Sequence, residues 1–239
     1  MDGVESSAVK IIMRAVELET DARLQPALTC YQEGIDLLLE VLKSCQDPEK
    51  KKRYRQKVSE YMTRAEQIKE MVKRQKEEGK YHELIHIKEN ETGFGYEKVF
   101  GSYLDHTVTE VHVEDAYIRN FPQINNFLQL CELLVLKCTN LKTINLMTTR
   151  DMNQHHQADN LDHIRTSLLK RSISLIITFS DSLHDREIRL NNGWIIKIGR
   201  GLDYFKRADK LSIGLHNLNL RTCHATTIDV FHSKHTKEK

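Results

Sequence analysis

Residues 47–72 read DPEKKKRYRQKVSEYMTRAEQIKEMV, and this stretch decides the fold of the first third of the chain. Its apolar residues recur at alternating steps of four and three, which places them on one face of an α-helix. They are Tyr54, Val58, Tyr61, Ala65, Ile68 and Val72. Asp47 is a suitable N-cap, Pro48 suits the first turn, and Gly79 offers a stop after the last turn. We therefore predict one long helix between Pro48 and Gly79.

Two shorter helical patterns precede this helix, one over residues 8–18 and one over about 26–42. Their apolar stripes are Ala8, Ile11, Ile12, Ala15, Val16 and Leu18 in the first, and Leu28, Tyr31, Ile35, Leu38 and Leu42 in the second. Because short connections make neighbouring helices antiparallel, residues 1–80 are expected to form an all-α three-helix bundle.

A different pattern begins after Gly79, where strand-like and helix-like segments alternate. The strand-like segments are residues 108–113, 144–146, 173–179, 194–198 and 226–231, and the helix-like segments are 124–135 and about 155–170. Strands that alternate with helices favour a largely parallel α/β sheet with helices on its faces. We therefore predict two domains: the bundle, a polar linker at 81–92, and an α/β domain over 93–239.

Composition and charge narrow the class of protein. No stretch approaches the length of a membrane-spanning helix, and the start of the chain lacks the pattern of a signal peptide. The five cysteines contain no CxxC pair, so we expect reduced, mostly buried thiols in the cytosol. Residues 184–239 carry 11 Lys and Arg against 6 Asp and Glu, so this last quarter is basic. A basic surface there can attract anionic lipid, nucleic acid or an acidic protein.

The long helix contains the run Tyr61-Met62-Thr63-Arg64-Ala65-Glu66-Gln67-Ile68-Lys69, which resembles the third helix of MIT domains. That resemblance implies a bundle that binds the C-terminal helices of ESCRT-III subunits in a groove between its own helices. The groove residues it implies are Leu38, Leu39, Met62, Ala65, Glu66 and Lys69. A flexible Met suits such a groove, because it adapts to several related peptides. The alternative is that Met62 is a core-edge residue and Glu66 a solvated charge.

The segment from His184 to Asn191 resembles the HxKxxxxD motif of the phospholipase D superfamily. In that family the His is the nucleophile, the Lys neutralises phosphoryl oxygens, and the Asp orients catalytic groups. Here Arg186 stands in place of the Lys and Asn191 in place of the Asp, and the motif occurs once. The resemblance therefore implies a catalytically defective lobe and a non-enzymatic protein. The alternative is a phosphodiesterase that works through a dimeric His184 site.

The combination of the two halves is similar to a family in which an MIT domain precedes such a lobe. Membership would imply a homodimer that binds anionic lipids and phosphoinositides and acts in abscission at cytokinesis. It would also place the protein in the cytoplasm, peripherally on late endosome membrane and at the midbody. The residues proposed for membrane contact are Arg186, Arg189, Lys197, Arg200, Lys206 and Arg207, interleaved with the aromatic residues Trp194, Tyr204 and Phe205.

Three remaining patterns predict no additional ligand. His232 and His235 have a spacing that a metal could use, but without evident Cys or carboxylate partners we expect a solvated tail and no metal. Gly199-Arg200-Gly201 lacks the ending of a phosphate loop, and no cofactor is expected. Nucleic-acid binding through the basic last quarter is a further alternative, although its residues form no recognisable nucleic-acid module, so we expect no nucleic-acid partner.

Overall fold

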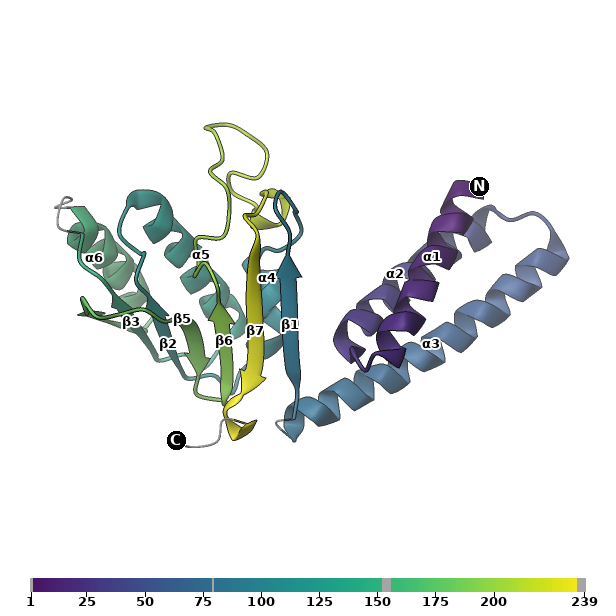
Figure 1. The fold of residues 1–239 in the computed structure, drawn as a ribbon, viewed down its shortest axis with the longest axis horizontal. Helices are drawn as coiled ribbons and strands as arrows, with labels where there is room; N and C mark the ends of the chain where they lie inside the picture. Colours follow the sequence, from purple (N-terminus) through teal and green to yellow (C-terminus); the bar gives the residue numbers. More distant parts are fainter. Residues whose placement is uncertain (1, 79, 152–155, 236–239) are drawn as a thin grey trace. The chain divides into compact units, whose positions relative to one another are not determined.

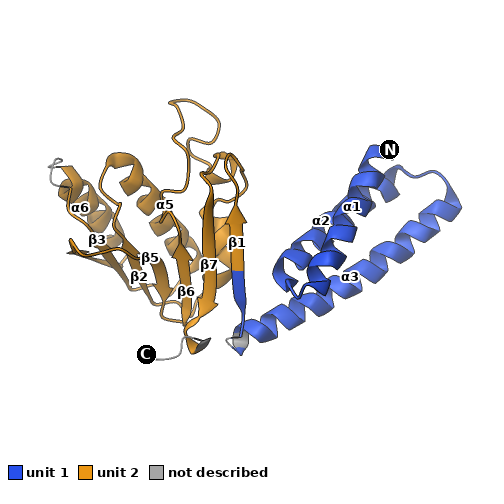
Figure 2. Ribbon diagram, viewed as in Figure 1, with its two compact units in different colours: residues 1–83 blue, residues 84–239 orange. Residues whose placement is uncertain are grey.

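The computed structural model describes residues 2–78, 80–151 and 156–235. The chain divides into two compact units, residues 1–83 and 84–239 (Figure 2). Each unit has its own set of buried apolar side chains.

The first unit contains three helices, which confirms the predicted bundle (Figure 1). They are α1 (Asp2–Thr20), α2 (Leu24–Ser44) and α3 (Pro48–Glu77). The Asp47 carboxylate caps α3 by accepting hydrogen bonds from the backbone N–H groups of Glu49 and Lys50, at 2.9 and 3.3 Å. The predicted stop at Gly79 lies outside the described residues.

Two features hold the three helices together. Gly34 of α2 lets α1 approach closely, because a Cβ at this position would lie 2.5 Å from the Ile12 Cδ1 atom of α1. Glu19 of α1 accepts a hydrogen bond from the Tyr31 hydroxyl of α2 at 2.9 Å and pairs with Arg64 of α3. The bond from Arg64 holds the pKa of the Glu19 carboxyl below its usual range. One carboxylate therefore joins all three helices.

The second unit is built on a seven-stranded sheet with the order β1-β7-β6-β5-β2-β3-β4. The strands are β1 (His82–Ile87), β2 (Glu110–Asp115), β3 (Thr143–Thr148), β4 (Ser174–Phe179), β5 (Arg186–Leu190), β6 (Trp194–Ile198) and β7 (Thr226–His232). The helices α4 (Tyr96–Phe100), α5 (Phe121–Lys137) and α6 (His156–Leu169) lie together on one face of the sheet (Figure 1).

The prediction of a largely parallel sheet is correct for only part of this sheet. Strands β2, β3 and β4 are parallel, and α5 and α6 are the crossovers that connect them. The β2–β5, β5–β6 and β6–β7 pairs are antiparallel. The connection between β5 and β6 is too short for a parallel crossover, which requires a dozen residues or more. Strand β5 was not predicted, because charged residues occupy three of its five positions.

The predicted linker at 81–92 contains a strand of the sheet. Strand β1 is the edge strand beside β7, and the segment that follows it is also tied to the domain. The Asn90 backbone N–H donates to the Cys223 carbonyl at 2.9 Å, and the Ala225 N–H donates to Glu89 Oε2 at 2.7 Å. Most of this segment is therefore part of the folded α/β domain. Its polar side chains are the reason that the sequence predicted a linker.

The two faces of the sheet differ in character. Towards the helices the strands bury aliphatic residues such as Val113, Ile188 and Ile196. On the opposite face Glu187 lies between Glu114 and Lys197 of the neighbouring strands. An antiparallel sheet tolerates one polar face in this way. Among the described residues, no helix has the length and apolarity that crossing a bilayer requires.

Candidate binding surfaces

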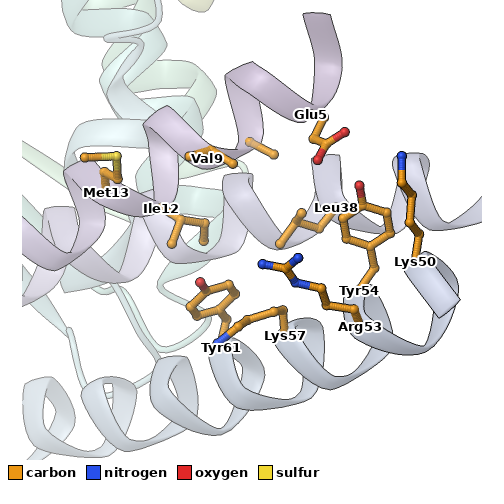
Figure 3. A pocket seen from close by; sticks show the side chains of 11 residues that line it. Glu5, Val9, Ile12, Met13, Leu38, Lys50, Arg53, Tyr54, Lys57 and Tyr61 are labelled. Carbon is orange, nitrogen blue, oxygen red and sulfur yellow. The ribbon is translucent and has the colours of Figure 1, made fainter. Parts of the chain in front are cut away.

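A groove of about 340 Å³ lies between α1 and α3 of the first unit (Figure 3). It is lined by Glu5, Ala8, Val9, Ile12, Met13, Leu38, Lys50, Arg53, Tyr54, Lys57 and Tyr61. The apolar lining comes mainly from α1, and the basic residues come from α3. A groove of this composition suits an amphipathic segment that presents apolar and acidic side chains.

The apolar edge of the groove is unusually exposed for the side of a bundle helix. Val9 and Met13, one turn apart on α1, are 49% and 60% exposed. Across the groove the Tyr54 hydroxyl hydrogen-bonds the Glu5 carboxylate, and this bond raises the pKa of Tyr54 to about 12. This contact links α1 and α3 at one end of the groove, while Val9 and Met13 remain free to meet another molecule.

The basic edge of the groove follows successive turns of α3. Lys57 already pairs with Glu60 at 2.7 Å. Within the part of the chain that the structure describes, Lys50 and Arg53 form no salt bridge. These two cations are therefore available to a carboxylate of a bound partner.

The structure places the six predicted peptide-binding residues on more than one side of the bundle. Leu38 lines the α1–α3 groove and is 5% exposed, whereas Ala65 belongs to the core. Met62 is 48% exposed, but it follows Tyr61 by one residue, a rotation of about 100° about the helix axis that turns it away from this groove. Glu66 and Lys69 are exposed, and so lie outside the core as well.

Leu39, the remaining predicted residue, is half-buried on α2. Sequence reasoning missed Val9 and Met13, although a signal was present. Val9, Met13 and Val16 recur at helical spacing beside the buried stripe of α1, so this helix is apolar around more of its circumference than the core requires.

The phospholipase D-like motif begins in the connection between β4 and β5. His184 is exposed there, and four residues separate it from the end of the strand that it was expected to follow directly. It opens onto a shallow hollow that is lined by His184, Asp185, Arg186, Lys197, Ile198, Gly199, Thr227 and Asp229. Among the described residues, no three His, Cys, Asp or Glu side chains gather as a metal site.

The two motif positions that depart from the family have structural contacts. Arg186 donates from Nη1 to the Gly199 carbonyl at 2.5 Å, and its guanidinium lies 4.5 Å from the centre of the Tyr117 ring. The Asn191 amide accepts hydrogen bonds from the backbone N–H groups of Thr109 and Glu110, at 2.9 and 3.2 Å. Asn191 therefore fixes the start of β2, and Arg186 fixes the turn after β6.

The six basic residues proposed for membrane contact differ in their partners and exposure. Arg189 and Lys197 flank Glu187 on the polar face of the sheet. Lys206 pairs with Glu89 and donates to Asn90 Oδ1 at 2.7 Å. Arg200 and Arg207 are exposed, and Arg186 is half-buried.

The expectation that aromatic residues accompany these cations at the surface is wrong. Trp194, Tyr204 and Phe205 are 7%, 0% and 4% exposed. They pack against one another and their neighbours: the Tyr204 and Phe205 ring centres are 4.2 Å apart, and Trp194 lies 5.1 Å from Tyr103. Burial of these large rings stabilises the core, so they are unavailable to a membrane.

The expectation of a solvated tail is also wrong for His232. This residue ends β7 and is 8% exposed. Its Nδ1 accepts a hydrogen bond from the Lys234 N–H at 3.2 Å, so Nε2 carries the proton and faces the Asn192 carbonyl at 3.1 Å. Both ring nitrogens of His232 therefore have hydrogen-bond partners within the fold.

Comparison with known proteins assigns both units. Residues 5–70 match the MIT (microtubule interacting and transport) domain, and residues 93–232 match a family described as a phospholipase D-like domain at the C-terminus of MIT. The chain is 50% identical over 240 residues to MIT domain-containing protein 1 of Mus musculus, and the match covers 99% of this chain and 96% of the mouse protein.

Proposed function

The chain belongs to the MIT domain-containing protein 1 family, and from this membership we propose that it is a non-enzymatic adaptor that joins ESCRT-III subunits to anionic membrane. An MIT domain implies partners of the ESCRT-III type. The proposed setting is abscission at cytokinesis, with the protein in the cytoplasm, at the midbody and on late endosome membrane.

The observation that supports peptide binding best is the α1–α3 groove. A partner helix with apolar side chains at i, i+3, i+4 and i+7 would bury them against Val9 and Met13. Acidic side chains of the same helix would reach Lys50 and Arg53 on the opposite edge. The surface that carries Leu39, Met62, Glu66 and Lys69 is proposed as a second contact surface, with Ala65 behind it in the core, whereas Leu38 lines the α1–α3 groove.

Two exposed methionines allow a matched test of these surfaces. Met13 lies in the α1–α3 groove and Met62 on the other flank of α3, and their exposures are similar. The full chain and its Met13→Asp and Met62→Asp variants are titrated with a panel of ESCRT-III C-terminal peptides. A helix in the groove predicts a loss of affinity of about tenfold or more for Met13→Asp, because a carboxylate replaces an apolar contact.

The pattern of losses assigns the surface. Loss with Met62→Asp alone would place the peptide on the second flank, and loss with both would require two contact surfaces. If neither variant changes the affinity of a peptide that binds, the proposed use of these surfaces is wrong.

The second unit is proposed to bind anionic phospholipids, including phosphoinositides, as a homodimer and without catalysis. The contacts of Arg186 and Asn191 support this proposal, since each of these side chains holds neighbouring backbone in place and neither is the Lys or Asp of the family motif. The alternative phosphodiesterase predicts turnover of a lipid or nucleic-acid phosphodiester that His184→Ala abolishes. Such turnover by the purified full chain would overturn the non-enzymatic proposal.

A further inference from the structure

Between β6 and β7 a long loop, residues 206–222, leaves the α/β domain, and it is drawn in yellow-green above the sheet in Figure 1. Its two ends are fastened together, because the Lys206 N–H donates to the Thr222 carbonyl at 2.8 Å. Arg221 fastens the returning limb by donating from Nε to the Gly214 carbonyl at 2.7 Å and from Nη2 to Leu215. The tip of the loop is thus presented from an anchored stem.

The tip carries two apolar side chains that the protein leaves uncovered. Leu211 is 100% exposed and Ile213 is 87% exposed. The Leu211 backbone has a φ of 62°, in the left-handed region that Leu rarely adopts. Exposing two protruding aliphatic side chains to water is unfavourable. A second molecule that covers them therefore lowers the free energy of the system.

Positive charge surrounds this apolar tip. The loop holds Lys206, Arg207, Lys210 and Arg221 against the single acidic residue Asp209. Lys206 is engaged by Glu89, but Arg207 and Lys210 are exposed and form no salt bridge within the described ranges. A molecule that covers the tip therefore meets at least two available cations.

A hollow of about 440 Å³ lies beside the stem, and Arg207 and Arg221 are among its lining residues. Asp203 also lines it, but its carboxylate already accepts hydrogen bonds from Gln123 and Asn126, at 3.1 and 3.0 Å. The hollow therefore holds one carboxylate against the cations Lys206, Arg207 and Arg221, and its lining keeps a net positive charge.

We propose that residues 206–222 form a membrane-insertion loop, in which Leu211 and Ile213 enter the acyl boundary of an anionic bilayer. Arg207 and Lys210 then remain at the level of the headgroup phosphates, where long basic side chains are favourable. A bilayer accommodates a convex apolar tip by displacing lipid, whereas a protein partner needs a matching pocket. The inference rests on the proposed membrane binding of this unit and names the residues that enter the bilayer.

Vesicle co-sedimentation of the full chain tests this insertion. Phosphatidylcholine vesicles with and without phosphatidylserine are compared for the wild type and for the double variant Leu211→Ser, Ile213→Ser. The matched control is Leu136→Ser, Leu169→Ser, which removes two leucines that are 75% and 67% exposed on α5 and α6. We expect the loop variant to partition about tenfold or more weakly into anionic vesicles, and the control variant to match the wild type.

Insertion itself is measured with Ile213→Trp and brominated lipid, which quenches a Trp inside the bilayer. The native Trp194 is 7% exposed and supplies a constant background. Quenching at position 213 is expected with anionic vesicles only.

The possible outcomes distinguish failure of the insertion loop from failure of membrane binding by the second unit. If the wild type binds no vesicle, membrane binding by this unit is wrong and the insertion loop with it. If the wild type binds and the loop variant binds equally, another surface meets the membrane and the insertion loop is wrong. Loss of binding with Arg207→Ser, Lys210→Ser, without quenching at position 213, shows adsorption by charge alone and also overturns insertion.

Discussion

At the scale of single residues, Tyr31 makes the free energy of unfolding of the bundle depend on pH in the alkaline range. Its side chain is 3% exposed and hydrogen-bonds Glu19, and burial raises the pKa of the phenol from 10 to about 12. Because the folded state holds this proton more tightly than the unfolded state, the stabilisation is complete below pH 10 and is lost as the pH rises through about 12. The stability advantage of the wild type over Tyr31→Phe should shrink across that window in thermal unfolding. An advantage that stays constant would contradict this account.

A second residue-scale prediction concerns Gly201, which follows β6 with a φ of 66°. A Cβ there would collide with the Asp115 carboxylate, which is 2% exposed and accepts the backbone N–H groups of Tyr117 and Leu202. Gly201→Ala should lower the free energy of unfolding by about 1–3 kcal/mol, from backbone strain and the lost fit. Denaturant unfolding measures this change.

The control for that substitution is Gly101→Ala, where the added methyl would meet Glu97 Cγ at an ordinary 3.6 Å and the backbone is αR. This variant should unfold like the wild type. Equal losses for the two glycines would refute the role assigned to the left-handed turn.

At the scale of elements, the sequence predicted those with strong periodicity and missed those whose role depends on distant partners. The α3 helix and its Asp47 cap follow from local spacing and local hydrogen bonds, so they were predictable. Strand β5 was missed because Arg186, Glu187 and Arg189 are charged. Their partners on β2 and β6 lie far away in the sequence, and only the folded sheet brings them together. The α1–α3 groove was missed because the sequence does not show which apolar face of α1 packs against α2. Only the folded bundle shows that Val9 and Met13 lie outside that contact.

Strand β1 gives the element-scale prediction. The family match begins at residue 93, yet β1 precedes it and forms the sheet edge beside β7. A fragment of residues 93–239 would expose the β7 edge. It would also lose the hydrogen bond from the Asn90 N–H to the Cys223 carbonyl and the one from the Ala225 N–H to the Glu89 carboxylate. Its melting temperature should lie several degrees below that of residues 81–239, because each lost kcal/mol lowers it by about 2–4 °C. Identical melting temperatures would show that β1 contributes nothing to this unit.

At the scale of the whole molecule, the proposed function couples two weak interactions in one chain. Anionic vesicles that also carry tethered ESCRT-III tails should bind the full chain at least about tenfold more tightly than vesicles that carry either ligand alone. The physical reason is effective concentration, because the first contact holds the second binding partner nearby. Met13→Asp and the loop variant should each remove this gain while leaving the other interaction intact. Vesicles with both ligands that bind no better than the stronger single ligand would argue against an adaptor.

The strand order β1-β7 has a consequence for the chain as it is synthesised. The three helices of the first unit can fold as soon as they leave the ribosome, since the contacts among them need no later part of the chain. Strand β1 emerges next, but its neighbour β7 is the last strand to be translated. Until then β1 is an unpaired edge, the kind of surface that invites association with other nascent chains. Premature termination before residue 226 would therefore release a folded bundle with an aggregation-prone strand attached, and chaperones would be needed throughout that interval.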